Sequence, residues 1–254
     1  MKIALNTVFL SFFLWSNAFS QTNNARSMTG LDWNKMSPRD RLLAIRFTTP
    51  AYQTEALRLI MEEASHVARD MALPETLPIT RSNLLSAYIT PPRLAEGMKA
   101  VGNITTSNYT YFVSIGNKFS FLVRTRLEAE EAEAHAKFLS PIRELDTNAA
   151  FQLATRFMTS AGMNMTALNT NCHISIQASL PEGTNSQHFV PLYWVNWIEN
   201  GTDQKGGASV QLCLPTQTLL QMHVNKPEYI LRPALVFTNL EELLSQTNPP
   251  ASSP

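Results

Sequence analysis

The sequence predicts an α+β protein made of two tandem units, in each of which a helix packs on an antiparallel sheet. Apolar residues follow a helical period in the stretches 51–71 and 149–162. Each of these stretches precedes shorter runs in which apolar and polar residues alternate, separated by turn residues. Helices followed by runs of strands favour antiparallel pairing over a doubly wound parallel sheet. The predicted boundaries are 37–140 for the first unit, 141–245 for the second, 21–36 for a flexible lead-in and 246–254 for a disordered tail.

The first twenty residues, 1–20, have the features of a secretory signal peptide. Lys2 is the only charge, residues 5–15 are almost wholly apolar, and residues 18–20 (Ala-Phe-Ser) resemble a signal peptidase site. The apolar stretch is too short for a membrane span, which takes about 20 apolar residues. We therefore expect cleavage near Ser20, and a secreted or periplasmic mature chain without a membrane span.

The first unit is expected to contain three helices, a strand and a hairpin. Ser37-Pro38 and Thr49-Pro50 each suit the start of a helix, because Ser and Thr cap the backbone and Pro fits the first helical position. Gly116-Asn117 lies between two alternating aromatic and β-branched runs, which is a strong hairpin signal. The expected elements are helices at 39–47 and 51–71, a strand at 83–90, hairpin strands at 109–115 and 118–125, and a helix at 127–139.

The second unit begins with a helix that Asp146 can cap and that Gly162 ends. The run 190–199 is apolar on both faces, which indicates a strand covered on both sides. The expected elements are a helix at 149–162, strands at 172–180, 190–199, 206–215, 218–224 and 232–238, and a last short helix at 240–244.

Cys172 and Cys213 are the only cysteines. In an oxidising compartment a single pair suggests one disulfide. Both cysteines lie in strand-like runs, and neighbouring strands could bring them within bonding distance. The alternative is two buried free thiols that pack as small apolar side chains.

The sequence holds no complete catalytic, metal-binding or nucleotide-binding motif, so we expect no cofactor. Glu63 and His66 have the Glu-x-x-His spacing of di-iron bundles, but the further ligands that such a site needs are not evident. Cys172 and His173 are adjacent in a predicted strand and would point to opposite faces, which argues against a thiolate–imidazole pair. A serine triad stays open, because triads assemble from distant positions.

One polar stretch, 102–108, leads directly into the predicted hairpin. Its Asn, Ser and Thr side chains either satisfy their own backbone or contact a ligand. The aromatic residues of the strands have two interpretations as well, core packing or an exposed face for a peptide or glycan. The candidate ligand-contacting residues are Arg93, Asn103, Thr105, Asn108, Tyr109 and Tyr111.

The second unit resembles the PepSY and cystatin-like group, in which one helix packs across a curved antiparallel sheet. An Ala-rich helix at 149–162 ends in glycine, and 209–222 reads as strand, turn and strand. The turn is Pro215-Thr-Gln-Thr218, where that family usually has Asp-x-x-x-Gly. The resemblance implies protease inhibition or the binding of partners at the cell envelope.

The whole chain also resembles uncharacterised exported bacterial proteins, through Pro91-Pro92-Arg93, the stretch 102–111 and the closing stretch 230–239. No activity follows from this second resemblance.

The net charge of zero gives no electrostatic argument for a nucleic-acid partner. The leading hypothesis is an exported, non-enzymatic protein that binds a protein, peptide or glycan. The alternatives are an extracytoplasmic hydrolase with an unrecognised Ser/Cys–His site, and a structural component of an envelope or extracellular assembly.

Overall fold

The computed structural model describes residues 50–89, 102–181, 187–201 and 206–236. All of them belong to one compact unit. The predicted signal peptide, the lead-in, the helices at 39–47 and 240–244 and the tail lie outside the described residues. No helix in the described ranges is long and apolar enough to cross a membrane.

One antiparallel sheet of nine strands runs through the described residues. The strands follow each other in space as β1-β2-β3-β4-β9-β8-β7, and β6 and β5 both pair with β7 at the far edge. Their bounds are β1 Ser86–Ile89, β2 Gly102–Thr105, β3 Tyr109–Val113, β4 Phe119–Arg124, β5 Ser140–Pro141, β6 Cys172–Ser179, β7 His188–Glu199, β8 Gly206–Cys213 and β9 Thr218–Val224. Because β4 pairs with β9, the strands of the two predicted units form a single sheet.

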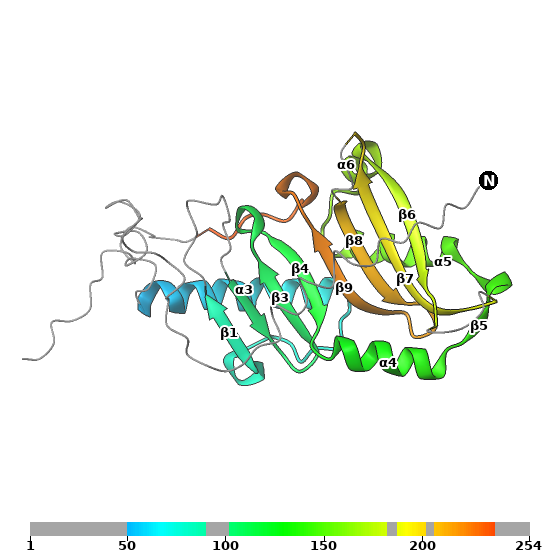
Figure 1. The fold of residues 1–254 in the computed structure, drawn as a ribbon. Helices are drawn as coiled ribbons and strands as arrows, with labels where there is room; N and C mark the ends of the chain where they lie inside the picture. Colours follow the sequence, from blue (N-terminus) through cyan, green and yellow to red (C-terminus); the bar gives the residue numbers. More distant parts are fainter. Residues whose placement is uncertain (1–49, 90–101, 182–186, 202–205, 237–254) are drawn as a thin grey trace, which may run out of the picture. The chain divides into compact units, whose positions relative to one another are not determined.

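Helices cover the two faces of this sheet unequally (Figure 1). The helix α3 (Pro50–Asp70) lies against β1 and β2, and α5 (Thr147–Ser160) and α6 (Met165–Asn171) lie against β6, β7 and β8. These three helices share one continuous core with the inward-facing side chains of the sheet. The helix α4 (Leu127–Lys137) covers part of the other face, where Ala134 packs with Val190, Leu192, Cys213 and Leu220. The predicted α+β class is therefore confirmed, with both long helices on the same side.

Local sequence signals account for most of these elements. The Asp146 carboxylate accepts a hydrogen bond from the backbone N–H of Ala149 and so caps α5. Gly162, with φ of +78°, follows the end of that helix in the left-handed conformation. Gly116 and Asn117 both have positive φ, as a tight hairpin turn between β3 and β4 requires.

Three expectations about secondary structure are wrong. Residues 102–105, expected as part of a polar loop, form β2, because Ile104 alone points into the core while its neighbours face away from it. The short helix α6 was not expected; Asn164 caps it, and Leu168 is the one buried side chain within it. Residues 232–236 form no strand, because Pro233 lacks a backbone donor and Arg232 turns back towards α3.

Candidate functional site

Among the described residues, α4 alone lies on the face of the sheet opposite α3 and α5, and it covers only part of that face. We call this side of the sheet the open face and define it by two rows of cross-strand neighbours, in which Gln211 lies beneath α4. The first row is Tyr88, Asn103, Phe112, Phe121, His223, Ser209, Asn196 and Ser175. The second row is Ser86, Thr105, Thr110, Val123, Gln221, Gln211, Trp194 and Gln177.

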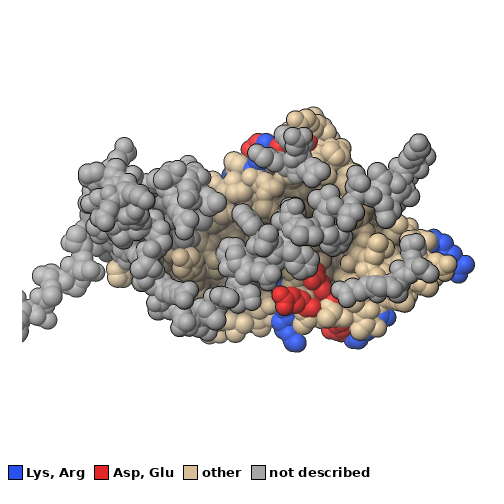
Figure 2. Space-filling model, viewed as in Figure 1, with Lys and Arg blue, Asp and Glu red and all other residues tan. Residues whose placement is uncertain are grey.

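The open face is uncharged but polar. Of the residues in the two rows, all of which the structure describes, none is Asp, Glu, Lys or Arg. Most are half-buried, so their side chains lie close together and still reach solvent. Acidic side chains gather instead around α4, which carries Glu128, Glu130, Glu131 and Glu133 (Figure 2).

Aromatic side chains occupy the middle of the first row. The ring centroids of Phe112 and Phe121 are 4.8 Å apart, and those of Phe121 and His223 are 5.4 Å apart in an edge-on arrangement. Burial lowers the pKa of His223. Its imidazole is therefore neutral at neutral pH, with one nitrogen as donor and the other as acceptor.

Amides and hydroxyls continue both rows across β8, β7 and β6. Gln211 is 2% exposed, and its Nε2 donates to Glu131 Oε1 of α4 at 2.5 Å. Its carbonyl oxygen is buried without a hydrogen-bond donor among the described residues. Buried polar atoms are rarely left unpaired, because each costs about 1–3 kcal/mol. An unpaired acceptor buried beneath α4 marks a place where an ordered water would be stabilising.

The structure divides the predicted ligand residues between the two faces of the sheet. Asn103 and Thr105 lie on the open face, as cross-strand neighbours of Phe112 and Thr110. Tyr109 and Tyr111 point the other way and are buried in the core. The hydroxyl of Tyr109 donates to the Leu219 carbonyl at 2.9 Å, so this side chain joins β3 to β9.

The half-buried carboxylate of Glu75, which the sequence patterns do not single out, holds the rest of the predicted loop. Glu75 Oε1 accepts hydrogen bonds from Thr106 Oγ1 at 2.6 Å and from Tyr111 OH at 3.0 Å. Asn108 Nδ2 donates to the Pro74 carbonyl at 2.6 Å. Asn108 and Tyr111 are therefore structural residues, which tie the hairpin to the segment after α3. Arg93 lies outside the described residues.

Cys172 and Cys213 are free and buried, so the structure shows the second of the two alternatives. Cys172 lies opposite Glu199 and Cys213 opposite Leu192, at different ends of β7. They also belong to different cores, Cys172 on the side of α5 and Cys213 on the side of α4. The sheet itself separates the two thiols.

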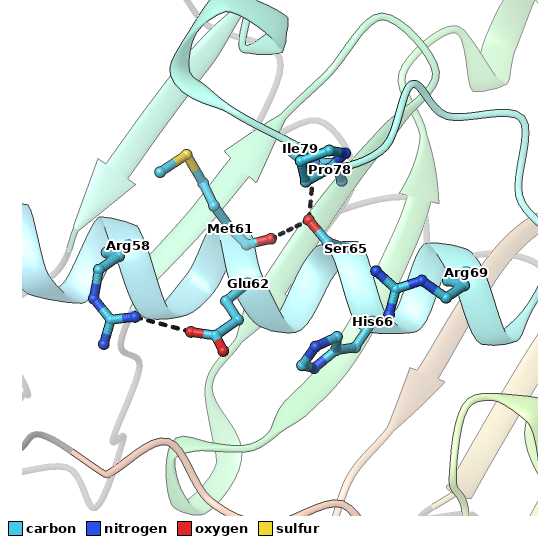
Figure 3. A pocket seen from close by; sticks show the side chains of 8 residues that line it. All are labelled: Arg58, Met61, Glu62, Ser65, His66, Arg69, Pro78 and Ile79. Carbon is cyan, nitrogen blue, oxygen red and sulfur yellow. Dashed lines mark hydrogen bonds and ion pairs between the residues drawn. The ribbon is translucent and has the colours of Figure 1, made fainter.

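A concavity lies on the outer side of α3, beside Pro78 and Ile79, with a cavity volume of about 270 Å³ (Figure 3). Arg58, which lines this cavity, is paired with Glu55 and Glu62. Glu63, which the Glu-x-x-His spacing placed with His66, does not line this cavity and pairs with Arg232. The described residues contain no group of three or more His, Cys, Asp or Glu that could hold a metal ion.

The alternation of residues along β3 is a sequence signal for the open face. Tyr109 and Tyr111 of β3 face the core. Because successive side chains of a strand point to opposite faces, Thr110 and Phe112 must lie on the other face. This signal does not extend to the open-face residues of β9 and β8, which are His223, Ser209 and Gln211. Their alignment with β3 depends on pairing between strands that are distant in the sequence.

Comparisons of this chain with protein-family models, with curated proteins and with solved structures found no match.

Proposed function

We propose that the protein is exported and acts by binding a neutral glycan on the open face of its sheet. The observation that carries the proposal is the composition of the two rows: aromatic rings and amide side chains side by side, without a charged residue. The localisation rests on the leader at residues 1–20.

The absence of charge in the two rows favours a neutral ligand over an anionic one. Phosphate and carboxylate ligands are recognised by Arg and Lys, through charge-assisted hydrogen bonds. Sugars offer hydroxyl groups, which pair with amide and hydroxyl side chains, and apolar C–H surfaces, which pack on aromatic rings. Asn196 and Ser209 supply the first kind of contact, and Phe121 and Trp194 supply the second.

Binding to a panel of neutral and acidic glycans, followed by calorimetry on the best ligand, tests this proposal with the full chain. Asn196→Ala should weaken binding about tenfold, which corresponds to about 1.4 kcal/mol, the worth of one or two hydrogen bonds. The matched control is Arg156→Ala, an exposed substitution on α5 at the other side of the sheet. Equal affinities for the two variants, or a preference for acidic glycans, would refute the proposal. Binding of peptides in place of glycans would refute the ligand class.

Export has its own test. Expression of the full chain with its leader in a bacterial host, followed by N-terminal sequencing of the exported protein, should give a mature chain that begins at Gln21. Retention of an uncleaved chain in the cytoplasm would contradict the proposed localisation.

One observation favours a second candidate, a hydrolase. Ser209 and His223 are direct cross-strand neighbours on the open face, and a neutral imidazole can act as a general base. The two rows contain no carboxylate to orient that imidazole, unlike a complete triad. Hydrolysis of activated esters that is lost in Ser209→Ala, or covalent labelling of Ser209 by a fluorophosphonate, would establish this candidate over simple binding.

A further inference from the structure

The strand β6 forms an edge of the sheet in the described part of the chain. Its ladder with β7 is regular from Cys172 to Ala178 and shifts only between Ala178 and Ser179. The short strand β5 pairs with β7 beyond that point, so it does not cover β6. Among the described residues β6 pairs with β7 alone. Alternate backbone N–H and C=O groups along β6 therefore point away from the sheet.

The sequence of this edge lacks the charged residues and the proline that commonly prevent strand pairing between chains. Natural edge strands are protected by charged residues, by proline or by being very short. The sequence of β6, CHISIQAS, contains no Asp, Glu, Lys, Arg or Pro, and the strand is eight residues long. Ile174 is 41% exposed on the face that carries the main core. An uncharged edge of this length favours addition of another strand.

We propose that two copies of the chain pair through β6, antiparallel and centred on Ser175. When the two-fold axis is perpendicular to the sheet, the open faces of both copies lie on the same side of the combined sheet. Such an axis must pass through a residue pair, and Ser175 is the midpoint of the regular ladder from Cys172 to Ala178. Ile174 then faces Ile176 of the second copy, and His173 faces Gln177 of the second copy.

The strand is complementary to itself in this register. Ile174 and Ile176 lie on the core side, as cross-strand neighbours of Trp197 and Val195. Pairing therefore places apolar side chains against apolar ones on that side. His173, Ser175 and Gln177 lie on the open-face side, where polar side chains meet polar ones. No like charges meet, because β6 has none.

This self-match favours a second copy over an unrelated extended peptide, which would have to supply the same alternation. The pairing also joins the open faces of the two copies. Ser175 belongs to the first row, and it would lie opposite Ser175 of the second copy. The dimer does not depend on the ligand proposed above, because it rests on the edge strand alone.

Sedimentation velocity of the full chain over a range of concentrations tests the proposal. The wild-type chain should sediment as a dimer, and Ile174→Lys should shift it to monomer, because an ammonium group would be buried against Ile176 of the second copy. Gln177→Lys introduces a charge on the other side of the same edge and should have the same effect. Tyr88→Lys is the matched control on β1, the opposite edge, and should leave the dimer intact. Circular dichroism melts establish that each variant is folded.

A wild-type chain that is monomeric at every concentration would overturn the proposal, as would a dimer that survives both β6 variants. Loss of the dimer in Tyr88→Lys alone would place the interface at β1 and overturn it as well.

A cysteine substitution tests the register. Directly opposed residues of antiparallel strands have Cα atoms about 4.5–5.5 Å apart, within the range that a disulfide spans. Ser175→Cys should therefore form a disulfide-linked dimer on mild oxidation, whereas Ser86→Cys on β1 should not. A folded Ser175→Cys variant that remains monomeric under oxidation would refute the centred pairing.

Discussion

Arg232 connects three parts of the described fold, and its replacement by methionine tests how much that connection contributes to stability. Its Nε donates to the carbonyl of Ala161, just after α5, at 2.8 Å. Its Nη1 lies 3.5 Å from Glu63 Oε1, and its Nη2 is paired with Asp70, both on α3. The Arg232 side chain is 13% exposed and that of Glu63 is 9% exposed.

The expected loss follows from which partners are buried. Asp70 is about half exposed, so its pair with Arg232 contributes at most about 1 kcal/mol. Glu63 is buried, and removal of one partner of a buried ion pair typically costs about 3–5 kcal/mol. We expect Arg232→Met to lower the free energy of unfolding by about 3 kcal/mol at neutral pH, since Glu63 can relieve part of the cost by taking up a proton.

The pH dependence of this loss has a definite sign. Burial raises the pKa of Glu63, and the Arg232 charge opposes that effect. A carboxyl group whose pKa is raised in the folded state favours the fold below its unfolded pKa, and this contribution is lost as pH rises through the folded pKa. Without Arg232 the pKa of Glu63 should rise further. The destabilisation should therefore be largest at neutral to alkaline pH and smaller in mild acid.

Urea denaturation of the wild type, Arg232→Met, Glu63→Gln and the double variant, at about pH 8 and about pH 5, measures this coupling. The double variant should recover more than half of the loss, because no buried charge is left unpaired. A loss below about 1 kcal/mol at neutral pH, or one that does not change with pH, would refute the reasoning.

Three further predictions concern single positions. Gly162→Ala should cost about 2 kcal/mol or more in thermal or urea unfolding, because a Cβ there would lie 2.8 Å from Arg232 Cγ at φ of +78°. Gly201→Ala, at the same φ with open space around it, should cost only about 1 kcal/mol, and equal losses would contradict the steric argument. Asp146→Ala should lower stability by about 1 kcal/mol while Asp146→Asn should have little effect, since both Asp and Asn can cap α5; equal losses would show that charge matters more than capping. The pKa of His223 measured by NMR titration should lie below the ordinary value for histidine. The imidazole then binds a proton more tightly in the unfolded chain than in the folded one. The free energy of unfolding should therefore fall as the pH drops below about 6.5. His223→Phe should reduce that fall, and an unchanged pH profile would contradict the assignment.

The sequence was sufficient for elements whose signals are local. The helical period of residues 51–71 gave α3, and the pair Gly116-Asn117 gave the hairpin of β3 and β4. Asp146 and Gly162 gave the two ends of α5. Each of these signals is contained within a few consecutive residues, because capping and turn formation involve near neighbours along the chain.

Long-range pairing decided what the sequence left open. Residues 102–105 carry a single core side chain, Ile104, so only the strands on either side make them β2. The pairing of β4 with β9 joined two predicted sheets into one, and no local signal specifies such a pairing.

The candidate site shows the same division between local and long-range information. Alternation along each strand fixes which side chains of that strand share a face. Once β2 and β3 are recognised as strands, this rule places Asn103 and Thr105 on one face of the sheet and Tyr109 and Tyr111 on the other. The row that places Phe121 beside His223, and His223 beside Ser209, exists only because distant strands pair in one register. The sequence alone thus determined most of the described elements, whereas the assembly of the open face was decided by the pairing of the sheet.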